Sequence, residues 1–171
     1  KNVVDPYELL QSLTGTKINY DEVKEIVRSY EKEHVPQKPL LPGVQERILE
    51  AKNLGAGVAI ASSSSTEWVE GHLHERNLLK YFDVTVCRGD VNKHKPDPEP
   101  YITALKKLDA HAKCSIAIED SSKGVAAAKA AGMYCIAVDG AMTKHMNLTE
   151  ADVQLGSLDE ITFHSLTKEL D

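Results

Sequence analysis

The fold is decided by the stretch IAIEDSSKG, residues 116–124. Its first three residues are apolar with β-branched Ile at both ends, which is typical of a buried strand. The Ala-rich segment 122–131 that follows predicts a helix, closed by a glycine. Two adjacent carboxylates, Glu119 and Asp120, therefore stand where a strand ends. They suit a hard divalent cation with oxygen ligands, and a helix cap formed by Asp120 or Ser121 is the equal alternative.

Outward from this stretch, short apolar runs alternate with amphipathic helical patterns. Such alternation indicates an α/β protein whose parallel strands form one sheet covered on both faces, a three-layer Rossmann-like arrangement. We expect strands over 57–61, 82–87, 115–118, 134–138 and 152–155, and helices over 44–54, 66–77, 100–108 and 122–131.

The first part of the chain has a different pattern, with helices alone. Residues 5–13 begin with Asp-Pro, which is typical of a helix start, and residues 19–34 have apolar side chains at helical spacing behind Asn19 as a cap. Three prolines within 36–42 then suppress helix and mark a hinge. We therefore predict two domains, residues 1–38 and residues 39–171.

Composition excludes several classes of function. Lys and Arg number 20 against 26 Asp and Glu, so the formal net charge is −6, and no basic block favours nucleic acid or an anionic membrane. No apolar run is long enough to span a bilayer. Three scattered cysteines, Cys87, Cys114 and Cys135, suggest buried free thiols in a reducing compartment. We expect a cytoplasmic protein, a monomer or weak dimer, without nucleic-acid or membrane partners.

Polar residues follow three successive predicted strands. Ser62 to Ser65 form a hydroxyl-rich turn that suits an anion, although a Ser-rich turn before a helix is more often a cap. Lys95 lies in a Pro-flanked loop after the next strand, where an isolated lysine is usually a solvated charge. The carboxylate pair follows the third strand. Ser64, Arg88 and His94 are further candidates for the rim of a substrate site.

The segments AIASS (59–63), KPDP (95–98) and IEDS (118–121) resemble the second, third and fourth sequence motifs of the haloacid dehalogenase superfamily. Accessory residues such as LPGV (41–44) resemble its β-phosphoglucomutase-like branch of sugar-phosphate phosphatases and mutases. The resemblance covers the chain from about Pro39 onward. It implies that residues 39–171 form the α/β core of that superfamily and that residues 1–38 are the remainder of its helical cap.

The resemblance also implies a mechanism, in which an aspartate attacks phosphorus and forms an aspartyl-phosphate. Ser62 and the Ser63 amide would hold the phosphoryl oxygens, and Lys95 would neutralise charge shared by phosphate and nucleophile. Glu119 and Asp120 would hold Mg²⁺. The expected activity is that of a Mg²⁺-dependent phosphatase acting on a small phosphorylated metabolite such as a sugar phosphate, with a phosphomutase of the β-phosphoglucomutase type as the close alternative.

The first motif of that superfamily, which supplies the nucleophilic aspartate on a central strand, has no match in this chain. Residues 3–7 have an apolar pair before Asp5 but lack the second aspartate. We therefore expect the nucleophile to lie outside these 171 residues, on a strand between those ending at Ser62 and Glu119. Direct hydrogen bonding between those two strands would disprove this. The other alternative is a binding module without the nucleophile, and the chain by itself is expected to be inactive.

Overall fold

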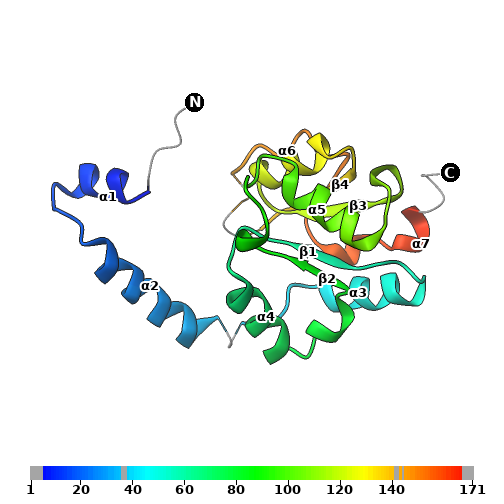
Figure 1. Ribbon diagram of the computed structural model, residues 1–171, viewed down its shortest axis with the longest axis horizontal. Helices are drawn as coiled ribbons and strands as arrows, with labels where there is room; N and C mark the ends of the chain where they lie inside the picture. Colours follow the sequence, from blue (N-terminus) through cyan, green and yellow to red (C-terminus); the bar gives the residue numbers. More distant parts are fainter. Residues whose placement is uncertain (1–5, 36–37, 141–142, 144, 167–171) are drawn as a thin grey trace. The chain divides into compact units, whose positions relative to one another are not determined.

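The computed structural model describes residues 6–35, 38–140, 143 and 145–166. These residues belong to two compact units, one within Lys1–Pro39 and the other within Leu40–Asp171. The first unit contains two helices, α1 (Pro6–Thr14) and α2 (Tyr20–His34) (Figure 1). Asn19 caps α2, as predicted, by accepting hydrogen bonds from the backbone of Asp21 and Glu22. The predicted cap at Asp5 and the proline-rich residues 36–37 lie outside the described residues.

The second unit has the alternating strands and helices that the sequence predicts. Its strands are β1 (Ala59–Ala61), β2 (Val84–Val86), β3 (Ile116–Glu119), β4 (Tyr134–Val138) and β5 (Val153–Leu155). Its α-helices are α3 (Val44–Asn53), α4 (Thr66–Glu75), α5 (Glu99–Leu108), α6 (Ser122–Ala130) and the short α7 (Phe163–Leu166), with 3₁₀ turns at Leu79–Tyr81, Arg88–Asp90, Ala112–Cys114 and Leu158–Glu160. Only α7 and the 3₁₀ turns were not predicted, because each is a single turn with too few residues to show a period.

All strand pairs are parallel, which confirms the α/β prediction, but the strands form two sheets rather than one. β1 pairs with β2, and β3 pairs with β4, which pairs with β5. Among the described residues no strand lies between β1 and β3, so each keeps one edge without a strand partner. Ile118, in the middle of β3, is 39% exposed, whereas side chains of a parallel sheet are normally buried on both faces.

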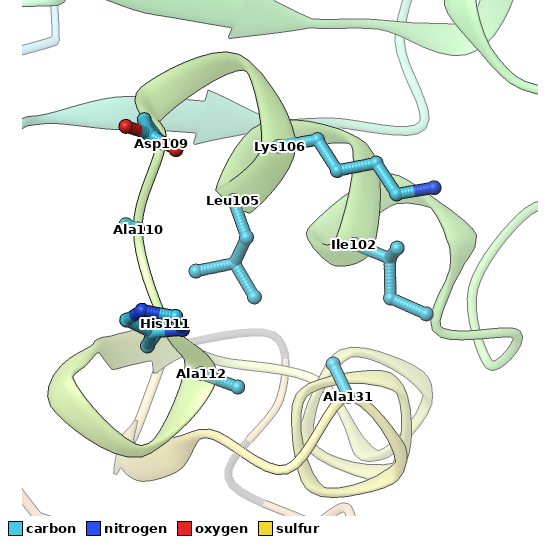
Figure 2. Close-up of a pocket in the computed structure, with 8 residues that line it drawn as sticks. All are labelled: Ile102, Leu105, Lys106, Asp109, Ala110, His111, Ala112 and Ala131. Carbon is cyan, nitrogen blue, oxygen red and sulfur yellow. The ribbon is translucent and has the colours of Figure 1, made fainter.

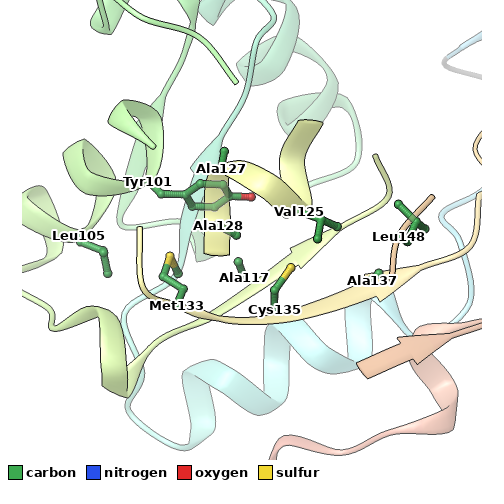
Figure 3. Close-up of a cluster of buried hydrophobic side chains, with 10 residues drawn as sticks. All are labelled: Tyr101, Leu105, Ala117, Val125, Ala127, Ala128, Met133, Cys135, Ala137 and Leu148. Carbon is green, nitrogen blue, oxygen red and sulfur yellow. The ribbon is translucent and has the colours of Figure 1, made fainter. Parts of the chain in front are cut away.

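Helix packing joins the two sheets. α5 contacts β1 and β2 and packs against α6, which in turn contacts β3 and β4. In Figure 1, α5 and α6 lie on one side of β1 and β2, and α3 and α4 lie on the other. The core between α5, α6 and the second sheet contains buried side chains from all three (Figure 3), among them Tyr101, Val125 and Cys135.

The cysteine prediction needs one correction. Cys87 and Cys135 are buried free thiols, but Cys114 is exposed because it lies in the 3₁₀ turn before β3 rather than in the strand itself. Burial raises the pKa of Cys135 to about 11, so this side chain stays a neutral thiol. No helix in the described part of the chain is both long enough and apolar enough to cross a membrane.

Asp83, just before β2, forms hydrogen bonds with Val58, just before β1. Its carboxylate accepts hydrogen bonds from Lys52 Nζ on α3 and from the backbone N–H of Val58, both at 2.8 Å, and its own N–H donates to the Val58 carbonyl. The hydrogen bond from Lys52, followed by the one from Val58, holds the pKa of Asp83 below its usual value. The carboxylate therefore stabilises the fold in its charged form.

Asp83→Asn is expected to lower the free energy of unfolding at pH 7 by about 0.5–1 kcal/mol, a modest value because the carboxylate is half-exposed. A pKa lowered in the folded state gives stability that is present above the unfolded-state pKa and is lost as pH falls through the folded-state pKa. The difference should therefore shrink as pH falls below the unfolded-state pKa and vanish once pH is below the folded-state pKa. Urea denaturation at pH 7 and at the lowest pH at which both proteins stay folded checks this, and an equal difference at both would contradict it.

Candidate active site

A cavity of about 610 Å³ opens where the strands of both sheets end. Ser62 to Ser64 reach it from the end of β1, Lys95 from the loop before α5, Glu119 to Ser121 from the end of β3, and Asp139 with Gly140 from the end of β4. Ligands of open parallel sheets bind at this edge. A second hollow, of about 390 Å³, lies between α5, the turn that follows it and the end of α6, and none of the predicted site residues line it (Figure 2).

The serine turn divides its roles between cap and cavity. Ser65 caps α4 by accepting a hydrogen bond from the Trp68 N–H at 3.3 Å. Ser62 continues the pairing of β1 with β2 through its N–H, and its hydroxyl accepts a hydrogen bond from the Ser64 N–H at 3.1 Å. The capping interpretation therefore holds for Ser65 alone, while the three preceding residues line the cavity.

The sequence left two alternatives for Asp120 and Ser121, which were a cation site or a helix cap, and the structure gives the cap to Ser121. The N-cap of α6 is Ser121, whose hydroxyl accepts a hydrogen bond from the Gly124 N–H at 3.1 Å. Asp120 is exposed and lines the cavity, so it is not the residue that caps the helix.

Glu119 lines the same cavity but its carboxylate lies inside the protein, 7% exposed. Its Oε1 accepts hydrogen bonds from Lys95 Nζ and from the Tyr101 hydroxyl, and Ser121 Oγ lies 3.5 Å from Oε2. The carboxylate occupies the space that a Cβ would take at Gly124, where an added Cβ would lie 1.9 Å from Oε2. The two adjacent acidic residues thus have different surroundings.

Lys95 is held at the wall of the cavity by groups from three elements. Its ammonium donates to the Ala61 carbonyl at the end of β1 at 2.9 Å and to Glu119 at the end of β3. It also lies 3.4 Å from the hydroxyl of Tyr101 on α5 and 4.8 Å from the centre of that ring. The side chain is only 13% exposed, so Lys95 is not the solvated loop charge that an isolated lysine usually is.

Sequence reasoning did not single out Tyr101 as a site residue, because its place on the apolar face of α5 indicates packing. The available signal was chemical, since a buried tyrosine needs a partner for its hydroxyl. Burial, followed by the nearby Glu119 carboxylate, raises the pKa of Tyr101 far above its usual value. The phenol therefore stays protonated and acts as a hydrogen-bond donor to Glu119.

Of the three predicted rim residues, only Ser64 lines the cavity. The Arg88 side chain donates from Nε to the Ser63 carbonyl at 2.8 Å, and the Arg88 N–H donates to the Ser64 carbonyl at 2.9 Å. Arg88 therefore fixes the backbone of the serine turn. His94 is exposed and does not line the cavity.

The donors at the cavity fit a weakly held Mg²⁺ better than a closed metal site. Within the described residues, no three His, Cys, Asp or Glu side chains are grouped closely enough to hold a metal. Mg²⁺ usually keeps several waters and binds through one or two carboxylates plus substrate phosphate. Asp120 offers one exposed carboxylate, and Glu119 offers a second only by leaving its contacts with Lys95 and Tyr101.

Comparison with known proteins agrees with this arrangement. The sequence profile of the family described as haloacid dehalogenase-like hydrolase matches residues 4–138. The phosphatase candidate YhcW of Bacillus subtilis is 34% identical over 97% of this chain and 76% of its own length. Hexitol phosphatase B of Escherichia coli is 35% identical over 75% of this chain and 59% of its own length.

Solved structures give the same relationship. CbbY from Rhodobacter sphaeroides in complex with phosphate has a TM-score of 0.68 and 36% identity over 71% of this chain. A β-phosphoglucomutase candidate from Thermotoga maritima has a TM-score of 0.75 and 28% identity over 95% of this chain. The chain spans 55% of the length of that CbbY and 76% of that of the Thermotoga protein. The chain belongs to the haloacid dehalogenase-like hydrolase family.

Proposed function

We propose that the protein is a Mg²⁺-dependent phosphatase that acts on a small phosphorylated metabolite, a sugar phosphate. The observation that supports this most is that Ser62, Lys95 and Asp120, from three separate strand ends or loops, line one cavity. A hydroxyl, an ammonium and an acidic metal ligand are the groups that phosphoryl transfer requires for positioning and charge compensation. The names of relatives, including hexitol phosphatase B, favour sugar phosphates as the substrate class.

In this proposal each site residue of the chain has a separate role in binding the phosphoryl group or the metal ion. The Ser62 hydroxyl and the Ser63 N–H hold two oxygens of the phosphoryl group at the end of β1. Lys95, already placed between the ends of β1 and β3, neutralises charge that develops on the phosphate. Asp120 would hold Mg²⁺, which supplies Lewis-acid stabilisation of phosphate charge when bound, while Glu119, the second metal ligand that the sequence predicts, keeps its contacts with Lys95 and Tyr101.

The nucleophile is the group that these residues do not supply. We propose that it is an aspartate on a strand that lies between β1 and β3, outside these 171 residues. The open edges of both strands support this, and so does the cavity, whose walls include Ile60 and Ala61 from β1 and Ile118 and Glu119 from β3. A carboxylate at the tip of such a strand would be close to Lys95. Residues 3–5, the weak alternative, lie outside the described residues.

The domain assignment and the location follow from the same proposal. Residues 1–38 would be the remainder of a helical cap, and residues 39–171 the catalytic core. The neutral, buried thiols of Cys87 and Cys135 suit a reducing compartment such as the cytoplasm.

An assay of the full-length protein tests the proposed activity. We expect inorganic phosphate to be released from hexitol phosphates with Mg²⁺ present, and the rate to fall to background when EDTA removes the metal. The chain of 171 residues alone should release none, because it lacks the nucleophile. Isomerisation of a sugar phosphate without phosphate release would favour the phosphomutase alternative, and no turnover of either kind by the full-length protein would favour a binding module.

A further inference from the structure

Each of the three N–H groups of the Lys95 ammonium has a hydrogen-bond acceptor within the protein. A lysine ammonium has three N–H groups. Three acceptors surround Nζ: the Ala61 carbonyl at 2.9 Å, the Tyr101 hydroxyl at 3.4 Å, and Oε1 of Glu119. A phosphate oxygen can therefore bind Lys95 only by taking the place of one of them.

These partners differ in how firmly they are placed. The Ala61 carbonyl is fixed by β1, and the Tyr101 ring is fixed in the buried core, where it packs with residues of α6 such as Ala127 and Ala128 (Figure 3). The Glu119 carboxylate ends a flexible side chain, and its Oε1 accepts hydrogen bonds from Lys95 and Tyr101, whereas the Ser121 hydroxyl donates to Oε2 only at 3.5 Å. The position of this carboxylate thus depends on the Tyr101 hydroxyl.

We infer that Tyr101 is a positioning residue for phosphoryl transfer, which acts by holding the Glu119 carboxylate so that Lys95 is kept in one orientation at the cavity wall. This inference rests on the proposed function for its consequence on catalysis. The phenol donates to Glu119 and accepts from Lys95, so the three polar groups are hydrogen-bonded to one another in a region where Tyr101 and Glu119 are buried. Hydrogen bonds in such surroundings are stronger than in water.

Tyr101→Phe removes only the hydroxyl and keeps the ring in the core. We expect kcat for phosphate release by the full-length protein to fall about tenfold, the size expected for one charge-assisted hydrogen bond. KM should change less than about twofold, because Lys95 matters most when charge develops in the transition state. Tyr81→Phe, which removes a hydroxyl from the 3₁₀ turn after α4, is the matched control and should leave both constants unchanged.

A second measurement does not depend on turnover. The acetylation rate of Lys95 relative to Lys93 in the same molecule, followed by mass spectrometry, reports how tightly the Lys95 ammonium is held. We expect the ratio to rise at least about threefold in Tyr101→Phe, because one anchor of the carboxylate is lost, and to stay constant in Tyr81→Phe. If Tyr101→Phe does not fold, Tyr101→Met, which fills the same core space with a flexible side chain, replaces it.

The two measurements separate this inference from the proposed function. A rise in the Lys95 ratio in a protein without phosphatase activity would support the positioning role and contradict the function. An unchanged ratio in the folded Tyr101 variant would overturn the positioning role, whatever the activity of the wild type. An unchanged kcat in an active enzyme would also overturn it.

Discussion

Lys95→Met is expected to reduce phosphate release by the full-length protein about a thousandfold. The Lys95 ammonium supplies positive charge at the wall of the cavity, and loss of such a group costs a phosphoryl- or acyl-transfer enzyme two to three orders of magnitude or more. Met keeps the apolar length of the side chain and removes the charge. Lys93→Met is the matched control, because the Lys93 side chain is 72% exposed and pairs with Asp97 at 3.5 Å. It should change activity and stability little.

Lys95→Met is also expected to lower the free energy of unfolding by about 3–5 kcal/mol, because it leaves the Glu119 carboxylate buried without its ionic partner. That is a large part of the roughly 5–15 kcal/mol by which most domains are stable. Adding Glu119→Gln should restore most of the stability and none of the activity. Urea denaturation and a phosphate-release assay of the single and double variants measure both effects. Wild-type turnover in Lys95→Met would show that Lys95 has no part in the chemistry.

Gly124→Ala is expected to destabilise the protein, although intrinsic helix propensity predicts the reverse. Ala in place of Gly inside a helix usually stabilises by about 0.5–1 kcal/mol. At Gly124, however, the new Cβ would occupy the space of the Glu119 carboxylate, with Oε2 at 1.9 Å. The side chain of Glu119 can rotate away, but it then loses Lys95 and Tyr101. We expect a net loss of about 2–4 kcal/mol, most of it from the broken ion pair, together with a large loss of activity.

Gly71→Ala is the control for this prediction. Gly71 lies inside α4, and an added Cβ there meets no atom within 4 Å, so the variant should be as stable as the wild type or more so. Thermal unfolding of both variants compares the same chemical change with and without the carboxylate in its way. If Gly124→Ala were stabilised to the same extent as Gly71→Ala, Glu119 would not occupy the position that the structure gives it.

The elements that the sequence predicts most accurately are those with a long repeat of apolar residues. The strand at 134–138 and the helix at 20–34 were predicted nearly to the residue. The site was predicted as residue types at strand ends, since parallel strands must bring their carboxyl ends to one edge. Which serine caps a helix and which lines the cavity could not be predicted, because Ser62 to Ser65 are chemically identical and differ only in backbone geometry.

The alternation of strands and helices could be predicted from the amino-acid sequence, because it depends on periodicity and local backbone preference, and the family motifs could be found in it as short runs of adjacent residues. The three-dimensional structure was needed to show that the five strands of the described residues form two sheets, in which β1 and β3 each have one edge without a strand partner. It alone also placed Glu119 against Tyr101 and Lys95 while Asp120 faces the cavity. Adjacent residues of a strand end point in opposite directions, and what each one meets depends on helices that are remote in the sequence.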